Sequence, residues 1–580
     1  MKPHSHPRPS PEPMPGPCPL RSILAAACLA GAAVSCGDRA AIHEADWDVE
    51  GPAPLATHLA YLDRTREEVV TVRAKETATR FAFEVVRQPV GRNPAFLLAS
   101  ADGTRALVVT RGTLGGPGLP EQEERLYRID PAGREAPVEY SLRSPFDRIS
   151  LSGDGRWAIA WFGHADAVNP NQMAVVRLDR TRESPTLRAL RSYGGRPLSV
   201  HLLTDLPVGG VPRQIALTLS ENYATMFDLE NLHRRDTTIR LIDPRSGASA
   251  RVIPEDAVVA KEHVSGSADE MPYVFLRAQG VADVYALAIF PNPAAADDQN
   301  DFRPVVNQVS VAGVPEDFVV FTRDGAAGER PEVRLLVVAG SGWRSSVVSI
   351  VDPRTANRWD VPLETSATRV LLFAFNDDRA GRARSVAFLW DATRGGVETR
   401  GSFLDLENVE TRRTLNLEVL DLGSTVDAVI PTADPVKLLL VHGGISRVSV
   451  LNVAERTVDR IGTTVSVGLS AMHPDGKALF FAGTGGASSR ISALDLEMRH
   501  AQDVRLDAPV RRLLALPGDP NLRTRDGRAL LVDHGWASGY VTALPLDQPH
   551  RARASSIQGF LAQGALDIDT EHYEGTEVAP

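Results

Sequence analysis

The sequence predicts an all-β protein in which about eight repeated four-stranded units close into a ring, and three observations predict it. After residue 54 the chain consists of short alternating apolar runs between turn signals, with almost no stretch of helical period. Two turn markers recur along the chain. The markers lie at a nearly constant distance from each other, and a period of about 40 to 55 residues with four strands per unit is typical of radially repeated β-sheets.

The first marker is an Asp-Gly turn followed by an apolar strand. Asp-Gly favours a tight hairpin because both central residues of a type I′ turn need positive φ. A glycine then closes the strand, as Gly112 does after Asp102-Gly103. Trp157 and Trp161 lie four apart on one such strand and share a face, so we expect core packing between units rather than a sugar platform. The other copies begin at Asp154, Asp324, Asp475 and Asp526.

The second marker is a strand that ends in an acidic or amide residue before a polar turn. Neighbouring copies are 43 to 64 residues apart, except for a gap of 109 residues between Asp243 and Asp352. We interpret that gap as two units with a degenerate marker at 289–292. Where a unit has both markers, the second follows the first by 20 to 28 residues. In chain order the copies end at Asp130, Asp179, Asp243, Asp352, Asp405, Asn452, Asp495 and Asp547.

The markers give nine candidate units, whereas about eight blades is the usual ceiling for such rings. We interpret the stretch from Asp228 to Arg235 as an extra loop in the third unit. Tyr61–Thr65 resembles the second marker and 557–566 has the pattern of a lone strand, so we expect the two terminal segments to pair and close the ring. The favoured fold is therefore a single β-propeller of about eight four-stranded blades, with seven or nine as alternatives.

The turns resemble those of bacterial WD40-like and YVTN-type β-propellers. The most similar copies are Asp243–Gly247 (DPRSG) and His473–Lys477 (HPDGK). The resemblance extends over roughly residues 90 to 556, and the Gly-His and Trp-Asp dipeptides of true WD40 repeats are missing. It implies a propeller fold but assigns no function, because turn motifs of this kind specify blades.

The first 36 residues predict export. Arg21 precedes an apolar run from Ile23 to Val34, and such a run rises about 18 Å as a helix, against roughly 30 Å for a bilayer core. This length predicts a signal peptide rather than a membrane span. Ala33–Cys36 resembles a bacterial lipobox, which implies that Cys36 is lipidated as the first mature residue. Gly37 stands where aspartate would favour the inner membrane, so the resemblance implies the outer membrane; an ordinary secretory signal cleaved elsewhere is the alternative.

The cysteine positions agree with a lipid anchor. Cys18, Cys28 and Cys36 all lie in the leader, so cleavage before Cys36 leaves one thiol and no internal disulfide. Lipidation consumes that thiol. We divide the chain into a lipoprotein signal peptide (1–35), a lipidated N-terminus with a flexible tether (36–54), the β-propeller (55–567) and an acidic C-terminal tail (568–580), and we expect it in the bacterial cell envelope.

Composition and motifs exclude several kinds of function. With 63 basic and 73 acidic residues the net charge is −10, the wrong sign for a protein that neutralises phosphates, so nucleic acid is not the expected partner. The sequence contains neither a P-loop nor a Gly-x-Ser-x-Gly elbow. We predict no cofactor and assign no catalytic residue.

Two sets of residues are candidates for metal ligands. His164, His442 and His534 each lie beside a strand-closing glycine and are expected near one rim, although separate polar turn residues are the favoured interpretation. Asp297 and Asp301 belong to an acidic segment that offers oxygen ligands for calcium. The segment lacks the glycine and the distal glutamate of a calcium loop, so a solvated loop is favoured.

The predicted leader and fold together favour a non-enzymatic scaffold, anchored in the envelope membrane, that binds a protein or peptide partner. The alternative is a propeller enzyme, lactonase-like or another hydrolase, with its site in the central channel. The two differ in whether polar and titratable side chains converge at the channel mouth.

Overall fold

The computed structural model describes residues 48–568, apart from 78–79, 114, 116–120, 165–166, 168, 181–185, 191–195, 247–250, 261–270, 324–331, 341–345, 378–381, 394, 413–415, 484–487, 519–526, 551–553 and 563–565. Asp48–Pro580 forms one compact unit, separate from Met1–Trp47. The predicted signal peptide, Cys36 and the tail beyond Ile568 lie outside the described residues. None of the described helices has the length and apolarity that crossing a bilayer requires.

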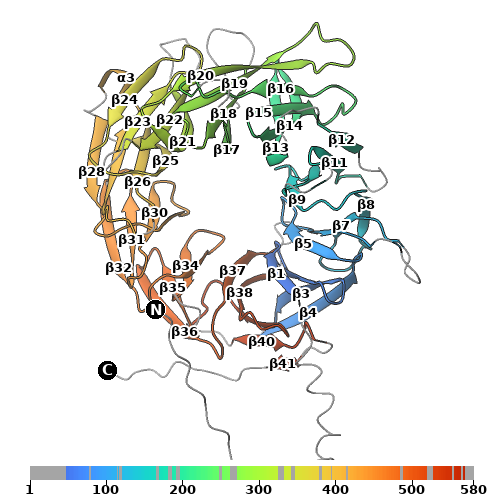
Figure 1. The fold of residues 1–580 in the computed structure, drawn as a ribbon. Helices are drawn as coiled ribbons and strands as arrows, with labels where there is room; N and C mark the ends of the chain where they lie inside the picture. Colours follow the sequence, from blue (N-terminus) through green and yellow to red (C-terminus); the bar gives the residue numbers. More distant parts are fainter. Residues whose placement is uncertain are drawn as a thin grey trace, which may run out of the picture. The chain divides into compact units, whose positions relative to one another are not determined.

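The described chain folds into ten antiparallel sheets, each built from consecutive strands, which we call blades 1 to 10 (Figure 1). Blades 1 to 5 contain β1 (Val49–Pro54), β2 (Leu59–Asp63), β3 (Glu68–Glu76), β4 (Phe81–Pro89); β5 (Pro94–Ala99), β6 (Ala106–Thr110), β7 (Arg125–Ile129), β8 (Val138–Ser141); β9 (Arg148–Leu151), β10 (Trp157–Trp161), β11 (Gln172–Arg177), β12 (Thr186–Ala189); β13 (Pro197–Val208), β14 (Val211–Ser220), β15 (Tyr223–Asp228), β16 (Thr237–Arg240); and β17 (Pro254–Ala260), β18 (Tyr273–Ala278), β19 (Asp283–Pro291), β20 (Phe302–Ser310).

Blades 6 to 10 contain β21 (Val314–Arg323), β22 (Glu332–Gly340), β23 (Ser346–Val351), β24 (Arg358–Pro362); β25 (Arg369–Asp377), β26 (Arg382–Trp390), β27 (Arg400–Asp405), β28 (Leu417–Asp421); β29 (Ala428–Pro431), β30 (Lys437–Val441), β31 (Arg447–Asn452), β32 (Thr457–Gly462); β33 (Leu469–Met472), β34 (Ala478–Ala482), β35 (Arg490–Asp495), β36 (His500–Arg505); and β37 (Arg512–Pro517), β38 (Arg528–Asp533), β39 (Tyr540–Leu544), β40 (Ser555–Gln558), β41 (Leu566–Ile568). A single helical turn, α3 (Val409–Arg412), lies between β27 and β28.

The blades form a ring in which the first strand of each blade lies at the centre and the fourth at the outside (Figure 1). Blade 10 has a fifth strand, β41, which pairs with β40. Each junction between consecutive blades has its own apolar core. Trp157 and Trp161 are buried in the core between blades 3 and 4, as their shared face predicted. The prediction of a single all-β propeller is therefore confirmed.

The predicted number of blades is wrong, because the chain forms ten rather than about eight. The missed blade is the first one. The sequence pattern of Tyr61–Thr65 predicts part of a closing segment. In the structure it lies at the end of β2, which belongs to the complete four-stranded sheet of blade 1. β1 begins at Val49, inside the segment assigned to the tether (36–54), so the propeller starts before residue 55.

One copy of the second marker, Asp243, does not end a third strand. β15, the third strand of blade 4, ends at Asp228, and the loop predicted as an insertion joins it to β16. Asp243 follows β16, the fourth strand of that blade. The marker was misread because β16 is only four residues long and is followed by an Asp-Pro turn.

The ring closes where blade 10 meets blade 1, without a shared strand. The rings of Tyr61 and Phe560 pack edge to face with centroids 5.3 Å apart. The Phe81 backbone N–H donates to Ser555 Oγ at 3.0 Å, and Arg512 donates to the Pro52 carbonyl at 3.1 Å. The predicted pairing of the terminal segments is therefore replaced by side-chain packing and hydrogen bonds between two complete sheets.

The loops lie at two opposite ends of the ring, because neighbouring strands are antiparallel. We call rim A the end that carries the loops from first to second and from third to fourth strands. Rim B carries the loops from second to third strands and from each blade to the next. Where the structure describes them, the Asp-Gly turns and the second markers other than Asp243 belong to rim A, since the turns precede second strands and these markers follow the third strands paired with them. This pairing explains their constant offset in the sequence. The Asp324-Gly325 turn lies outside the described residues.

Candidate functional site

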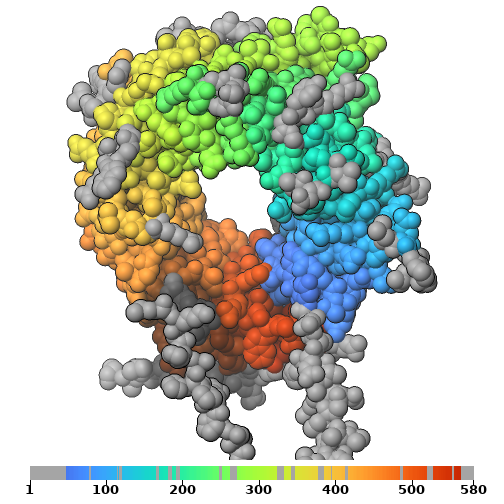
Figure 2. Space-filling view, viewed as in Figure 1, coloured from blue at the N-terminus to red at the C-terminus, as the bar shows by residue number. Residues whose placement is uncertain are grey.

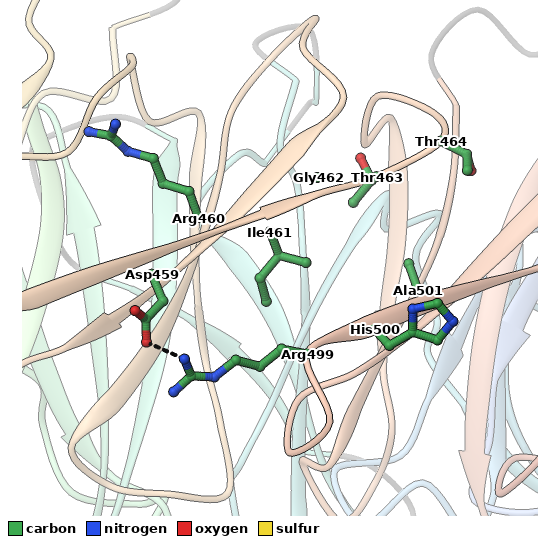
Figure 3. Close-up of a pocket in the computed structure, with 9 residues that line it drawn as sticks. All are labelled: Asp459, Arg460, Ile461, Gly462, Thr463, Thr464, Arg499, His500 and Ala501. Atoms are coloured by element: carbon green, nitrogen blue, oxygen red, sulfur yellow. Dashed lines mark ion pairs between the residues drawn. The ribbon is translucent and has the colours of Figure 1, made fainter.

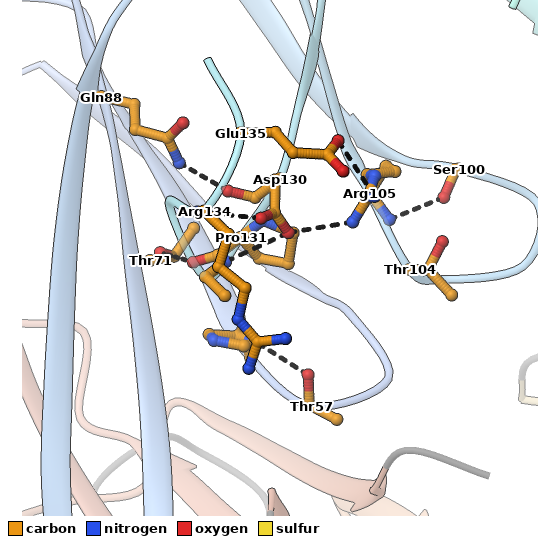
Figure 4. Close-up of polar contacts among 12 residues, drawn as sticks. Thr57, Thr71, Gln88, Ser100, Thr104, Arg105, Asp130, Pro131, Arg134 and Glu135 are labelled. Carbon is orange, nitrogen blue, oxygen red and sulfur yellow. Dashed lines mark hydrogen bonds and ion pairs between the residues drawn. The ribbon is translucent and has the colours of Figure 1, made fainter. Parts of the chain in front are cut away.

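A polar network at rim A joins blades 1 and 2 through the second marker of blade 2 (Figure 4). Asp130 accepts hydrogen bonds from Arg105 Nη1 at 2.9 Å and from the Arg134 backbone N–H at 3.0 Å. Its backbone carbonyl accepts from Gln88 Nε2, on β4 of blade 1, at 2.6 Å. Thr71 Oγ1 on β3 donates to the Pro131 carbonyl at 2.6 Å. The network fixes the turn after β7 against the neighbouring blade.

His58 lies in the loop from β1 to β2, close enough to this network for the charge of Asp130 to affect its pKa. The side chain is buried, and its Nδ1 lies 2.7 Å from Thr57 Oγ1. Burial lowers the pKa of His58 from 6.5 to about 4, with further lowering by the charge of Arg73 and a smaller opposing effect of Asp130. The imidazole is therefore neutral across the physiological pH range.

A similar arrangement occurs at rim A between blades 9 and 10. His473 is buried in the loop from β33 to β34, and its Nδ1 accepts the Asp475 backbone N–H at 3.0 Å. Arg528, which opens β38, lies 2.9 Å from Asp475 Oδ2, and His473 Nε2 lies 3.5 Å from Asp547 Oδ1. Burial is the main cause of the lowered pKa of His473. In the sequence, His473 stands in the turn motif HPDGK, whereas no sequence signal identifies His58.

Exposed charges differ between the two rims. On the described loops of rim A, carboxylates outnumber cations. The exposed carboxylates are Asp102, Glu135, Asp154, Asp179, Glu230, Asp297, Asp298, Glu455, Asp475, Glu497 and Asp547, and the exposed cations are Arg80, Arg134, Arg180, Arg235, Arg354, Lys477 and Arg499. Rim B mixes the signs, with Arg92, Arg111, Arg143, Arg245, Arg251 and Arg511 beside Glu121, Glu123, Glu364, Asp427 and Asp507. Among the described loops, those of rim A are thus the more negative.

The three histidines considered as metal ligands lie on rim B, in three different blades. His442 Nδ1 donates to the Thr425 carbonyl and its Nε2 lies 2.8 Å from Ser449 Oγ. His534 has the equivalent partners, the Pro509 carbonyl and Thr542 Oγ1. Burial lowers the pKa of both side chains. Both nitrogens of each of these two rings have a hydrogen-bond partner. Each histidine therefore links the loop before a first strand, through a backbone carbonyl, to the third strand of the same blade, through a hydroxyl group.

His164 is exposed, and its ring packs against the edge of Phe162 with centroids 5.7 Å apart. Within the described part of the chain, no three His, Cys, Asp or Glu side chains lie close enough together to hold a metal ion. The structure therefore does not bring His164, His442 and His534 together.

The acidic segment 297–301 forms part of the loop from β19 to β20 on rim A. Asp301 Oδ2 lies 2.8 Å from Arg213 Nη2 and 3.0 Å from Arg234 Nη1. Asp298 Oδ2 lies 2.7 Å from Arg235 Nη2, whereas Asp297 is exposed. Blade 4 thus supplies positive charge to this segment, and the loop ties blade 5 to blade 4.

The central opening is visible in the space-filling view (Figure 2). The first strands that surround it are rich in apolar residues, and β5, β29 and β33 carry no ionisable side chain. Asp317 on β21 accepts hydrogen bonds from the backbone N–H groups of Phe318 and Val370, both at 3.0 Å. Because Val370 lies on β25, this carboxylate links blade 6 to blade 7. Burial raises the pKa of Asp317. The other seven first strands do carry ionisable side chains, among them the exposed Arg148, Glu316 and Arg369, so the described channel wall is mixed in character.

A groove of about 510 Å³ lies on the outside of the ring between β32 of blade 8 and β36 of blade 9 (Figure 3). Asp459 and Arg499 form an ion pair of 2.9 Å across it. Ile461 and Ala501 pack at the same junction, which gives the groove an apolar floor. His500 and Arg460 are exposed beside it. No sequence signal identified this groove, because its two walls belong to strands of different repeats.

No protein-family model matches the chain, and no curated protein is significantly similar to it in sequence. Similar solved structures include the dihydro-heme d1 dehydrogenase NirN in complex with DHE, at 12% identity and a TM-score of 0.37 over 80% of this chain and 79% of that chain. Hsv2 of Kluyveromyces lactis has 9% identity and a TM-score of 0.28 over 62% and 92%. The β-propeller domain of Myceliophteria thermophila Cps50 (Swd1) has 12% identity and 0.27 over 61% and 94%. These values assign no function, and the chain's own sheet topology establishes it as a β-propeller of ten blades.

Proposed function

We propose that the protein is a non-enzymatic scaffold, lipid-anchored in the bacterial cell envelope through Cys36, that binds a protein or peptide partner. The observation that carries this proposal is the form of the described propeller. A rigid ring of ten blades presents two rims of loops around a central channel. Rigid rings with many loops suit binding, because the loops can vary without disturbing the sheets.

The leader supports the anchored location. Ala33–Cys36 resembles a lipobox, and every cysteine of the chain lies in the predicted leader. The bracing of rim A supports a binding role for that surface. Its turns are held in place by side-chain hydrogen bonds to aspartates such as Asp130, so their exposed groups are already ordered before a partner arrives.

Photo-crosslinking in cells tests the binding role. A photoreactive amino acid replaces Lys477, which is exposed on rim A, and in a matched variant it replaces Val397, which is exposed on rim B. We expect one predominant adduct from the Lys477 position, whose partner, once identified by mass spectrometry and purified, binds the purified propeller. Absence of any adduct, together with hydrolysis of lactone or ester substrates by the purified chain, would overturn the proposal in favour of a channel enzyme.

A further inference from the structure

We propose that rim B faces the membrane and that rim A, with its exposed carboxylates, points away from the lipid toward the partner. This orientation rests on the proposed lipidation of Cys36. Two independent features of the described propeller carry it, namely the direction in which the chain enters the ring and the difference in charge between the rims.

The chain enters the propeller at rim B. β1 is the first strand of blade 1, and the loop that follows it lies at rim A, where the Ala56 backbone N–H donates to the Gly103 carbonyl at 2.8 Å. Gly103 belongs to the Asp-Gly turn of blade 2, which fixes the position of that loop. Val49, at the opposite end of β1, therefore lies at the rim B end of the innermost strand.

The length of chain before β1 makes rim B the easier rim to bring to the bilayer. Thirteen residue steps separate Cys36 from Val49, since 49 − 36 = 13, and they span at most roughly 45 Å when fully extended. To bring rim A to the membrane outside the ring, this segment would have to cross a blade of four strands, roughly 15 to 20 Å, and then run along the height of the sheets, about 20 Å. Such a path uses nearly all of the available length, whereas rim B needs almost none of it.

Charge favours the same orientation. Bacterial membrane surfaces are rich in anionic headgroups, and their potential acts on charges within about one Debye length, roughly 8 to 10 Å. The described loops of rim A carry an excess of exposed carboxylates, so facing the lipid would cost repulsion there. The described loops of rim B have nearly balanced charge, with Arg92, Arg111 and Arg143 exposed on neighbouring blades.

Single-cysteine labelling tests the orientation in the full-length, lipidated protein. Val397 is 86% exposed in the loop from β26 to β27 on rim B, and Met498 is 76% exposed in the loop from β35 to β36 on rim A. Each is replaced in turn, as V397C and M498C, and labelled with a fluorescent maleimide. The labelled proteins are reconstituted into phosphatidylethanolamine–phosphatidylglycerol vesicles that contain lipids with a nitroxide headgroup.

We expect the nitroxide lipids to quench most of the V397C fluorescence and little of the M498C fluorescence. Equal quenching of the two labels, or stronger quenching of M498C, would overturn the orientation. The wild-type chain separates this failure from failure of the proposed function: a lipidated Cys36 takes no maleimide and the protein stays with the vesicles, whereas a labelled wild type that remains in solution contradicts the anchor itself.

Discussion

His58 is one of the buried imidazoles that make the stability of the propeller depend on pH. The folded protein holds its pKa at about 4, whereas the unfolded chain has the ordinary value of 6.5. The stabilisation is therefore complete above pH 6.5 and is lost as the pH falls through 6.5 toward 4, because the unfolded state takes up the proton first. The full effect is on the order of 3 kcal/mol.

Replacement of this histidine by a neutral group is expected to remove that dependence. The melting temperature of H58Q should fall less than that of the wild type between about pH 7 and pH 4.5. His164→Gln, a change at an exposed histidine, is the matched control and should keep the wild-type profile. Parallel melting profiles for wild type and H58Q would show that His58 is not held neutral by the fold.

Asp301 pairs with two arginines, and we expect its charge to act on them rather than to hold calcium. Asp301→Asn leaves Arg213 and Arg234 without their shared carboxylate, and we expect a loss of about 1–2 kcal/mol in the free energy of unfolding, between the ranges for exposed and buried pairs. Asp297→Asn, at an exposed position of the same loop, should change little. Denaturant melts with calcium or with chelator should coincide, and stabilisation by calcium that D301N abolishes would contradict this assignment.

At the scale of the element, the Asp-Gly hairpin turns hold neighbouring blades together. Gly476 has φ of +65°, and a Cβ there would lie 2.4 Å from the backbone nitrogen of Ala433 in blade 8. Gly155 has φ of +70° in the same kind of turn with nothing within 4 Å of its Cβ position. Replacing each of these two glycines by alanine therefore distinguishes two contributions to the free energy of unfolding: the strain of a left-handed backbone, which both share, and the clash with blade 8, which only Gly476 has.

We expect Gly155→Ala to lower the free energy of unfolding by about 1–2 kcal/mol, because a non-glycine residue is strained in the left-handed conformation. Gly476→Ala should cost roughly 2–5 kcal/mol, because the backbone of blade 8 must also shift. Equilibrium denaturation of the two variants measures the difference. Equal losses would mean that the Asp-Gly turns stabilise only their own hairpins.

These hairpins were predictable from sequence because Asp-Gly and the offset between markers are local signals. Asp154-Gly155 and Asp475-Gly476 do form turns before buried strands, but only their glycines have positive φ, so the turns are not of the predicted type I′. The Asp243 marker misled because it follows a fourth strand. The groove between β32 and β36 and the cluster around His58 join residues of different repeats, and no local pattern encodes such contacts.

At the scale of the whole molecule, the sequence predicted a closed ring but not its size. The sequence of each unit predicts its own four strands. The number of blades depends instead on small angles between neighbouring sheets and on how the first and last blades pack together. The sequence alone does not reveal blade 1, because Tyr61–Thr65 has the pattern of a closing segment. The structure instead closes the ring by packing Tyr61 against Phe560 between two complete blades.

The central claim is that this ring is an anchored scaffold, and lipidation of Cys36 tests it most directly. The measurement is metabolic labelling with a radioactive fatty acid, followed by membrane fractionation, for wild type and Cys36→Ala. Cys36 lies before the propeller, so the substitution should leave the folded ring unchanged. We predict that only the wild type is labelled and sediments with the envelope. Equal behaviour of the two chains as unlabelled, exported soluble proteins would contradict the account.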